Sequence, residues 1–160
     1  MKNILLIITV LFLYGCQTVE RVTLPVNSDN KVEYYRQLNY GSLKREQIYD
    51  KIIQWIVIKY QDKDIKQRSR TDGTISILGR GNYQYKGNSK IVGYKLVFLI
   101  DDETCKIIIT DINIRSGKNI ELFYDDYNND GGRNTKLSKA FSYINDAMND
   151  ALKQITDNIQ

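Results

Sequence analysis

The sequence predicts an α+β fold in which one antiparallel sheet packs against two helices. Apolar residues recur every three or four positions in residues 43–60 and again in residues 135–159, a spacing typical of amphipathic helices. Between these segments, from Ile65 to Ile114, the pattern changes to a period of two. Turn signals interrupt this stretch, so it predicts consecutive antiparallel strands.

The first strand and the first helix are predicted at residues 32–40 and 43–60. Residues 32–40 are rich in tyrosine, and Gly41-Ser42 ends this strand, with Ser42 as a candidate N-cap. In the helix, one face carries Ile48, Tyr49, Ile52, Ile53, Trp55, Ile56 and Tyr60. A one-sided apolar face predicts that this helix packs on the sheet.

Four strands follow as a meander. Asp72-Gly73 predicts a tight hairpin between residues 65–70 and the strand that begins at Thr74. Gly87-Asn88 supplies the next turn, and residues 101–104 turn the long strand 91–100 back into the strand 105–114. Residues 117–135 read as irregular and polar apart from Ile120–Tyr124.

The last helix, residues 135–159, has the most regular pattern of the chain. Its apolar face is predicted to consist of Leu137, Phe141, Ile144, Met148, Ala151, Ile155 and Ile159. A coiled-coil dimer uses the same spacing. This face lacks regular flanking charge pairs, which favours packing on the sheet. The predicted order is β-α-β4-α, with both helices on one face of the sheet in a two-layer arrangement.

Composition excludes several kinds of active site. The chain of 160 residues contains no histidine, which excludes Ser-His-Asp and Cys-His nucleophilic systems and histidine metal sites. The formal net charge is only +4, and no basic stripe of the kind that binds nucleic acid is present, so we expect no nucleic-acid partner.

The N-terminus resembles a bacterial lipoprotein signal. Lys2 precedes the apolar run from Ile4 to Leu13, which is too short to span a bilayer, and Leu13-Tyr14-Gly15-Cys16 follows. The resemblance implies a signal peptide at residues 1–15 and a lipidated Cys16. Cys16 begins a stretch to residue 31 that is expected to be a tether, because it contains the only proline and a polar cluster, and residues 32–160 are expected to form a single domain. An ordinary cleaved signal with a coincidental cysteine is the alternative.

The lipid anchor implies a place in the cell envelope. Two or three acyl chains on the N-terminal cysteine attach a protein to a membrane effectively permanently. By analogy with enterobacterial sorting, Gln17 in place of Asp argues for the outer membrane. Residues 17–21 contain a single acid, which favours the periplasmic face.

Four other sequence features have simpler structural explanations. Cys105 heads an apolar run and is expected to be a buried thiol, and Asp101-Asp102-Glu103 are expected to be solvated acids in a tight turn. Gly79-Arg80-Gly81 lies within a strand, so it predicts a close backbone approach or a bulge and not a phosphate loop. Asp126–Gly131 matches the first half of a calcium loop, but Leu137 occupies the position of the bidentate glutamate. We therefore expect no cofactor, no metal and no catalytic residue.

The long strand is apolar on both faces, which points to binding. Val92, Tyr94, Leu96, Phe98 and Ile100 alternate with Ile91, Lys95, Val97 and Leu99. In the next strand, Ile107 and Ile109 are expected to face one way, and Ile108, Ile112 and Ile114 the other. If both helices cover one face, apolar surface remains exposed for a partner or ligand, unless residues 17–31 or 117–134 fold over it.

The central part of the chain resembles the DUF4468 family of small secreted or lipid-anchored bacterial proteins. The resemblance covers roughly residues 32–116. It lies in Ile48-Tyr49 and Trp55, in the run from Asp72 through Leu78-Gly79-Arg80-Gly81-Asn82-Tyr83, and in the strand from Tyr94 to Lys106 and Ile112. It implies a fold like that of the TATA-box-binding protein. It implies no activity, since none is assigned to the family.

The sequence thus favours a non-enzymatic, lipid-anchored envelope protein that binds a protein or ligand through its sheet. Its expected partners are the membrane, through the lipid on Cys16, and an envelope protein. Two alternatives remain open, an envelope enzyme of the hydrolase type with an unrecognised site and a structural protein of the membrane or wall.

Overall fold

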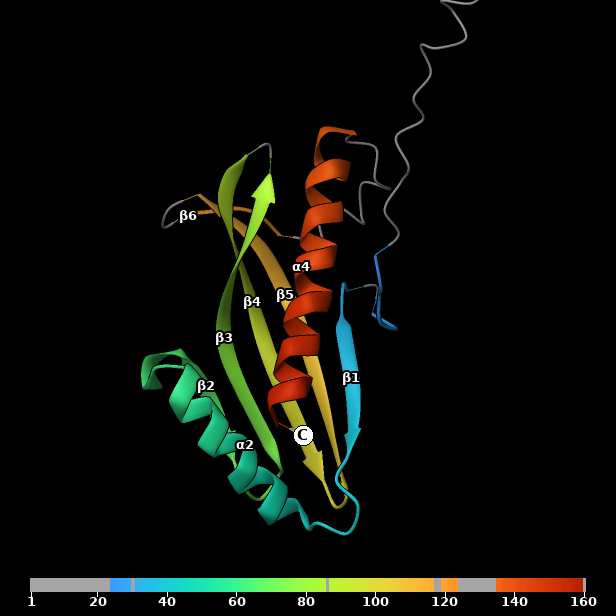
Figure 1. Ribbon diagram of the computed structural model, residues 1–160, viewed down its shortest axis with the longest axis vertical. Helices are drawn as coiled ribbons and strands as arrows, with labels where there is room; N and C mark the ends of the chain where they lie inside the picture. Colours follow the sequence, from blue (N-terminus) through green and yellow to red (C-terminus); the bar gives the residue numbers. More distant parts are fainter. Residues whose placement is uncertain (1–23, 30, 86, 117–118, 124–134, 160) are drawn as a thin grey trace, which may run out of the picture.

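The computed structural model describes residues 24–29, 31–85, 87–116, 119–123 and 135–159. These residues form an antiparallel sheet with two α-helices on one face (Figure 1). This confirms the predicted α+β class and element order. The elements are β1 (Tyr34–Asn39), α2 (Arg45–Lys59), a 3-10 turn (Asp62–Asp64), β2 (Ile65–Ser69), β3 (Thr74–Tyr85), β4 (Asn88–Asp101), β5 (Thr104–Ser116), β6 (Asn119–Phe123) and α4 (Thr135–Ile159).

The strands are arranged in the order β1-β5-β4-β3-β2, and every pair is antiparallel. The predicted meander is therefore confirmed as β2 to β5. Gly73 has a φ of 63° in the turn between β2 and β3, a conformation that favours glycine and suits the predicted Asp-Gly turn.

The strand β6 was not predicted from the sequence, which read residues 117–135 as irregular. It pairs with residues 113–116 of β5, while β1 pairs with residues 104–109 of the same strand. The strands β1 and β6 therefore lie one after the other along the same edge of β5. A five-residue strand shows little alternation, and β6 lacks the Asp-Gly turn that made the equally short β2 predictable.

The core lies between the helices and the sheet. Ile75 and Ile77 of β3, Leu96 and Phe98 of β4, and Ile107 and Ile109 of β5 have no exposed surface. Facing them, α2 contributes Ile48, Ile52 and Ile56, and α4 contributes Phe141, Ile144 and Met148. Both helices use the apolar faces that their sequence spacing predicts.

Among residues 141–159 of α4, whose side chains are described, the buried apolar face differs from the prediction at one position. The deeply buried residues are Phe141, Ile144, Met148, Leu152, Ile155 and Ile159, while Ala151 is only half-buried. The α-helix has 3.6 residues per turn, so a straight helix drifts away from a strict seven-residue repeat. This drift turns Leu152 toward the core. Because α4 buries its apolar face against its own sheet, that face is not left exposed for a coiled coil.

A bulge in β5 overturns one expectation about the faces. Asp111 has a φ of 51°, and the register with β4 shifts between Gly93 and Lys95. Ile112 and Ile114 therefore return to the helix-covered face, where they are 2% and 7% exposed, and Ile108 alone remains on the other face. The extra residue of a bulge reverses the alternation that follows it.

The packed part of the chain reaches back at least to Leu24, within the stretch that was expected to be a tether. Leu24 is buried in the core, Val26 bridges to Val32, and the amide of Glu33 donates to the carbonyl of Pro25 over 3.0 Å.

Candidate binding surface

The face of the sheet opposite the helices carries side chains from four strands. We call this surface the open face and define it by Tyr35 of β1, Leu78 of β3, Lys95, Val97 and Leu99 of β4, and Lys106 and Ile108 of β5. The register places them together, because Leu78 lies opposite Lys95, Val97 opposite Ile108 and Ile108 opposite Tyr35. Both α-helices lie on the other side of the sheet (Figure 1).

The open face is apolar at its centre and partly exposed. Leu78 and Leu99 are each 42% exposed, and Tyr35 is 61% exposed. Val97 is half-buried, and Ile108 is almost covered by its neighbours. On the helix-covered face, by contrast, the adjacent Phe98 is completely buried. The pattern of two apolar faces in β4 is therefore confirmed, with only one face under helices.

Cationic side chains lie among these apolar groups. The ammonium group of Lys106 is 4.5 Å from the ring centroid of Tyr35 and 3.6 Å from the carboxylate of Glu33. Lys95 and Arg80 line a hollow of about 310 Å³ beside Leu78, together with Asp64, Asp111 and Asn113. The open face thus combines apolar area with groups that can donate hydrogen bonds to a partner or accept them from it.

Gly79 is packed beneath the ring of Tyr94. A methyl group at position 79 would overlap this ring, which is buried and whose hydroxyl shares a hydrogen bond with Tyr60. The close backbone approach that the glycines predict is confirmed at Gly79, and an aromatic ring is the group that approaches. Burial raises the pKa of both Tyr60 and Tyr94, so both hydroxyls stay protonated at neutral pH.

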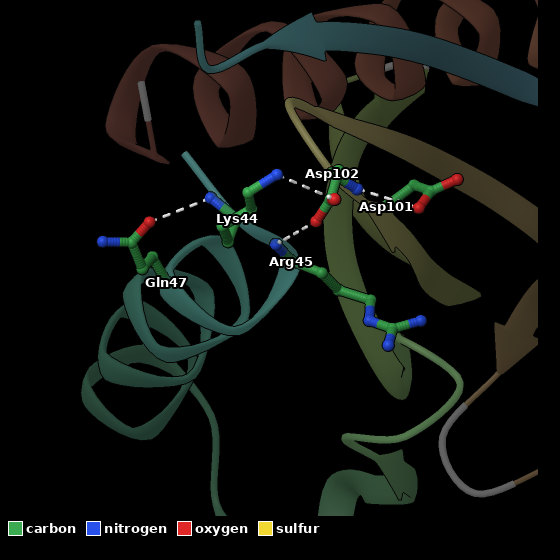
Figure 2. A network of polar contacts seen from close by, with 5 residues as sticks. All are labelled: Lys44, Arg45, Gln47, Asp101 and Asp102. Atoms are coloured by element: carbon green, nitrogen blue, oxygen red, sulfur yellow. Dashed lines mark hydrogen bonds and ion pairs between the residues drawn. The ribbon is translucent and has the colours of Figure 1, made fainter. Parts of the chain in front are cut away.

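The acidic turn between β4 and β5 fastens the sheet to α2 (Figure 2). The backbone N–H of Arg45 donates to Oδ1 of Asp102 over 3.0 Å, and Nζ of Lys44 is 3.3 Å from Oδ2. The Arg45 amide and the Lys44 ammonium hold the pKa of Asp102 below its usual range. The acids are exposed in a turn, as predicted, and Asp102 also caps a helix.

This contact also explains why α2 begins later than predicted. The helix starts at Arg45, with Lys44 and not Ser42 as its N-cap residue. The amide of Lys44 donates to the side-chain oxygen of Gln47, and the first helical amide is satisfied by Asp102 from another part of the chain (Figure 2). A capping group supplied by a distant turn leaves no local sequence signal.

Cys105 is buried in the core, as the sequence predicts. Its side chain has no exposed surface, and burial raises the pKa of its thiol to about 12. The thiol therefore stays protonated at neutral pH, whereas a reactive cysteine requires the thiolate.

Other candidate residues lie outside the described part of the chain. Cys16 is one of them, and so is the loop Asp126–Gly131 that resembles half a calcium site. Within the described residues, no three His, Cys, Asp or Glu side chains are grouped so that they could hold a metal ion. None of the helices described here has the length and hydropathy of a membrane span.

A family model matches residues 34–115, which is half of the chain. Its description is a domain of unknown function, DUF4468, with a TBP-like fold. The chain belongs to the DUF4468 family. A comparison with curated proteins finds no match.

Two solved structures show that the DUF4468 fold extends over most of this chain. A TBP-like protein from Parabacteroides distasonis has a TM-score of 0.69 at 19% identity and covers 85% of this chain and 96% of its own. A DUF4468 family protein from Bacteroides ovatus has a TM-score of 0.67 at 16% identity and covers 91% and 93%. At these identities the likeness establishes the fold alone, so function must be argued from the surfaces of this DUF4468 chain.

The sequence pattern predicted only part of the open face. It identified Val97, Leu99, Lys95 and Ile108, because β4 and the start of β5 alternate regularly. It did not identify Tyr35 or Leu78. Their side depends on the pairing of β1 with β5 and of β3 with β4, which the sequence alone leaves open.

Proposed function

We propose that this protein is a lipid-anchored, non-enzymatic module of the bacterial cell envelope that binds a protein or ligand through its open face. The observation that carries the proposal is the exposure of the open face. Its side chains Leu78, Leu99 and Tyr35 are 42 to 61% exposed, while the opposite face of the same sheet is buried under the helices. Exposed apolar side chains gathered on one face of a stable protein mark a candidate binding site.

The surrounding charges support binding as the role of this surface. Lys95 is half-buried on the open face, and Lys106 lies over the ring of Tyr35. Lysine stems extend apolar area while their ammonium groups remain in water. A partner would therefore bury an apolar centre and meet cationic groups around it, the usual arrangement of a protein interface.

The anchor rests on the sequence of residues 1–16. The run Leu13-Tyr14-Gly15-Cys16 after a short apolar segment resembles a lipoprotein signal. Lipid on Cys16 would hold the domain at the outer membrane on its periplasmic side. There the open face would meet its partner at a restricted distance from the bilayer.

The test is crosslinking in native envelopes followed by affinity purification of the tagged chain. Leu99→Glu places a charge on the open face, and Ile58→Glu is the matched control, because Ile58 is an exposed apolar residue on α2. We expect a crosslinked partner that is retained by Ile58→Glu and lost by Leu99→Glu. Equal capture by both variants would refute a role for the open face.

The anchor is tested in the same experiment with Cys16→Ser. We expect this variant to leave the membrane fraction and to lose the partner, because its attachment to the bilayer is gone. A Cys16→Ser protein that stays in the membrane fraction would contradict lipidation at this residue.

A further inference from the structure

On its outer side, the strand β3 is paired along only part of its length. The strand β2 pairs with residues 74–77 of β3, and no described strand pairs with residues 78–82 on that side. The reason lies at the start of β2. Ile65 is paired with Ile77, and the chain immediately before it forms the 3-10 turn Asp62–Asp64 and leads back to α2.

The edge of residues 78–82 has no described strand beside it and offers backbone groups to a partner, although residues 59–64 lie near Leu78 and Arg80 at its lower end. In an antiparallel pair, every second residue of a strand directs its N–H and C=O groups toward one neighbour, and the residues between direct theirs away. Natural edges are usually protected by lysine, proline or a covering element. This stretch is Leu78-Gly79-Arg80-Gly81-Asn82, which contains no proline and one cation.

A groove follows the same edge on the helix side. It encloses about 460 Å³ between β3 and α4, and its walls include Gly81 and Asn82 from the strand and Asp146, Asp150 and Gln154 from the helix. Gly81 has no side chain to fill this part of the groove, and a Cβ placed there would meet Val92 at 3.4 Å and Met148 of α4 at 3.9 Å.

The groove carries negative charge on its helical wall. Asp146 and Asp150 are exposed and four residues apart, so both lie on the same side of α4. No described residue forms an ion pair with either carboxylate. Tyr143, which is 49% exposed, continues the wall one turn earlier and contacts Tyr85 edge to face.

We propose that residues 78–82 of β3 accept an extended, positively charged peptide segment as an additional strand, with its basic side chains directed at Asp146 and Asp150. The addition of a strand to an exposed edge is an established mode of peptide recognition, in which backbone hydrogen bonds give affinity and side-chain pockets give specificity.

The spacings of the two elements agree with this arrangement. Four residues of helix advance about 6 Å, and two residues of a strand advance about 6.6 Å. Since α4 runs along the sheet beside its strands (Figure 1), lysines at alternate positions of the added strand would match the two aspartates in turn. The residues between these lysines would point to the other face of the sheet, where Leu78 and Arg80 lie, and uncharged side chains fit best there.

The experiment uses an acetylated and amidated peptide of four Lys-Val repeats, with the full chain held in neutral detergent. Fluorescence anisotropy measures binding, and amide hydrogen exchange reports on residues 78–82. We expect binding that weakens with added salt, together with slower exchange within residues 78–82. A Glu-Val peptide of equal length should not bind. Equal binding of both peptides, or no change in exchange on this stretch, would overturn the proposal.

Backbone methylation separates strand addition from simple charge attraction. Two Lys-Val peptides are N-methylated on all lysines or on all valines, so each has one of its two edges blocked while its charge is unchanged. We expect one of them to bind and the other not to bind. Equal binding of both would show that no strand is formed and would overturn the proposal.

The charge contribution is tested with Asp146→Lys combined with Asp150→Lys. We expect affinity to fall on the order of tenfold, since each exposed ion pair contributes a few-fold and reversal doubles the effect. Asp157→Lys is the matched control, because Asp157 is also exposed on α4 but does not line the groove. Equal loss in both proteins would overturn the assignment of the groove.

Two other occupants of the edge are distinguished in the same measurements. Slow exchange of residues 78–82 in the free monomer would mean that another segment of the chain covers the edge, and slow exchange in a sedimenting dimer would mean that a second copy does. Either result overturns the proposal. Leu99→Glu, which tests the open face, should leave peptide binding unchanged, so failure here and failure of the proposed function are separable.

Discussion

At the scale of single residues, Gly79 and Gly81 look alike in the sequence but have different surroundings. A Cβ at position 79 would overlap the ring of Tyr94, whereas a Cβ at position 81 would meet Val92 at 3.4 Å, an ordinary contact. We expect Gly79→Ala to lower the free energy of unfolding by about 1–3 kcal/mol, because overpacking displaces the ring. Gly81→Ala should change it little or raise it by about 0.5–1 kcal/mol, because glycine is unfavourable in strands.

Urea unfolding of the two alanine variants checks this difference. Both substitutions add one methyl group to the same strand, so the local backbone effect is matched. Similar unfolding midpoints for the two proteins would contradict the packing of Tyr94 over Gly79.

The same glycines show what the sequence predicts about single residues and what it does not predict. A glycine inside a strand predicts a close approach, and that prediction is confirmed at Gly79. The sequence could not say that Tyr94 is the neighbour, because the pairing of Gly79 with Tyr94 depends on the register of β3 with β4. Likewise, the burial of Cys105 followed from its apolar run, whereas the sides of Ile112 and Ile114 depended on a one-residue bulge.

At the scale of elements, the turn between β4 and β5 stabilises the start of α2. Asp102 accepts a hydrogen bond from the first helical amide at Arg45 and pairs with Lys44. A carboxylate at a helix N-terminus is favoured by the unsatisfied amides and by the helix dipole. These contacts lower the pKa of Asp102 in the folded protein. The ionised carboxylate therefore stabilises the native state more than the protonated carboxyl group does.

The sign of the pH dependence follows from this shift. A lowered pKa contributes stability above the pKa of the unfolded state, about 3.9, and the contribution is lost as the pH falls through the folded pKa. We expect Asp102→Asn to have a lower Tm than the wild-type chain at pH 7. The two Tm values should converge as the pH is lowered below about 4.

Thermal unfolding followed by circular dichroism from pH 7 to pH 2 measures both effects. Asp157→Asn is the control, since Asp157 is an exposed residue of α4 with no contact to this turn. A difference between Asp102→Asn and the wild-type chain that persists unchanged at pH 2 would refute the electrostatic explanation.

Elements were predicted well where their pattern is long, and poorly where it is short or where a distant residue sets their boundary. The 25 residues of α4 and the alternation of β3, β4 and β5 gave clear periods. The helix start at Arg45 depends on a remote residue, Asp102, whereas β6 was missed because it is short and pairs only with the last residues of β5, 113–116. The groove beside β3 was also missed, since it arises only when β2 ends short and α4 is in place.

At the scale of the whole molecule, the two-layer arrangement gives the sheet two unequal faces. Phe98 lies under the helices and has no exposed surface, while its neighbour Leu99 is 42% exposed on the open face. The same strand therefore serves as core and as candidate binding surface. Alternating apolar residues on both faces predicted this dual character, and family membership accounts for the fold but assigns no partner.

Alanine substitutions at these two neighbouring positions test the arrangement. We expect Phe98→Ala to reduce the free energy of unfolding by about 3–5 kcal/mol, because it leaves a cavity between helices and sheet. Leu99→Ala should cost about 1 kcal/mol or less, because its side chain is already partly in water and the transferred area is small. Guanidinium unfolding curves measure both. Comparable losses for the two variants would mean that the open face is covered in the native protein, and a covered face could not be the surface that binds a partner.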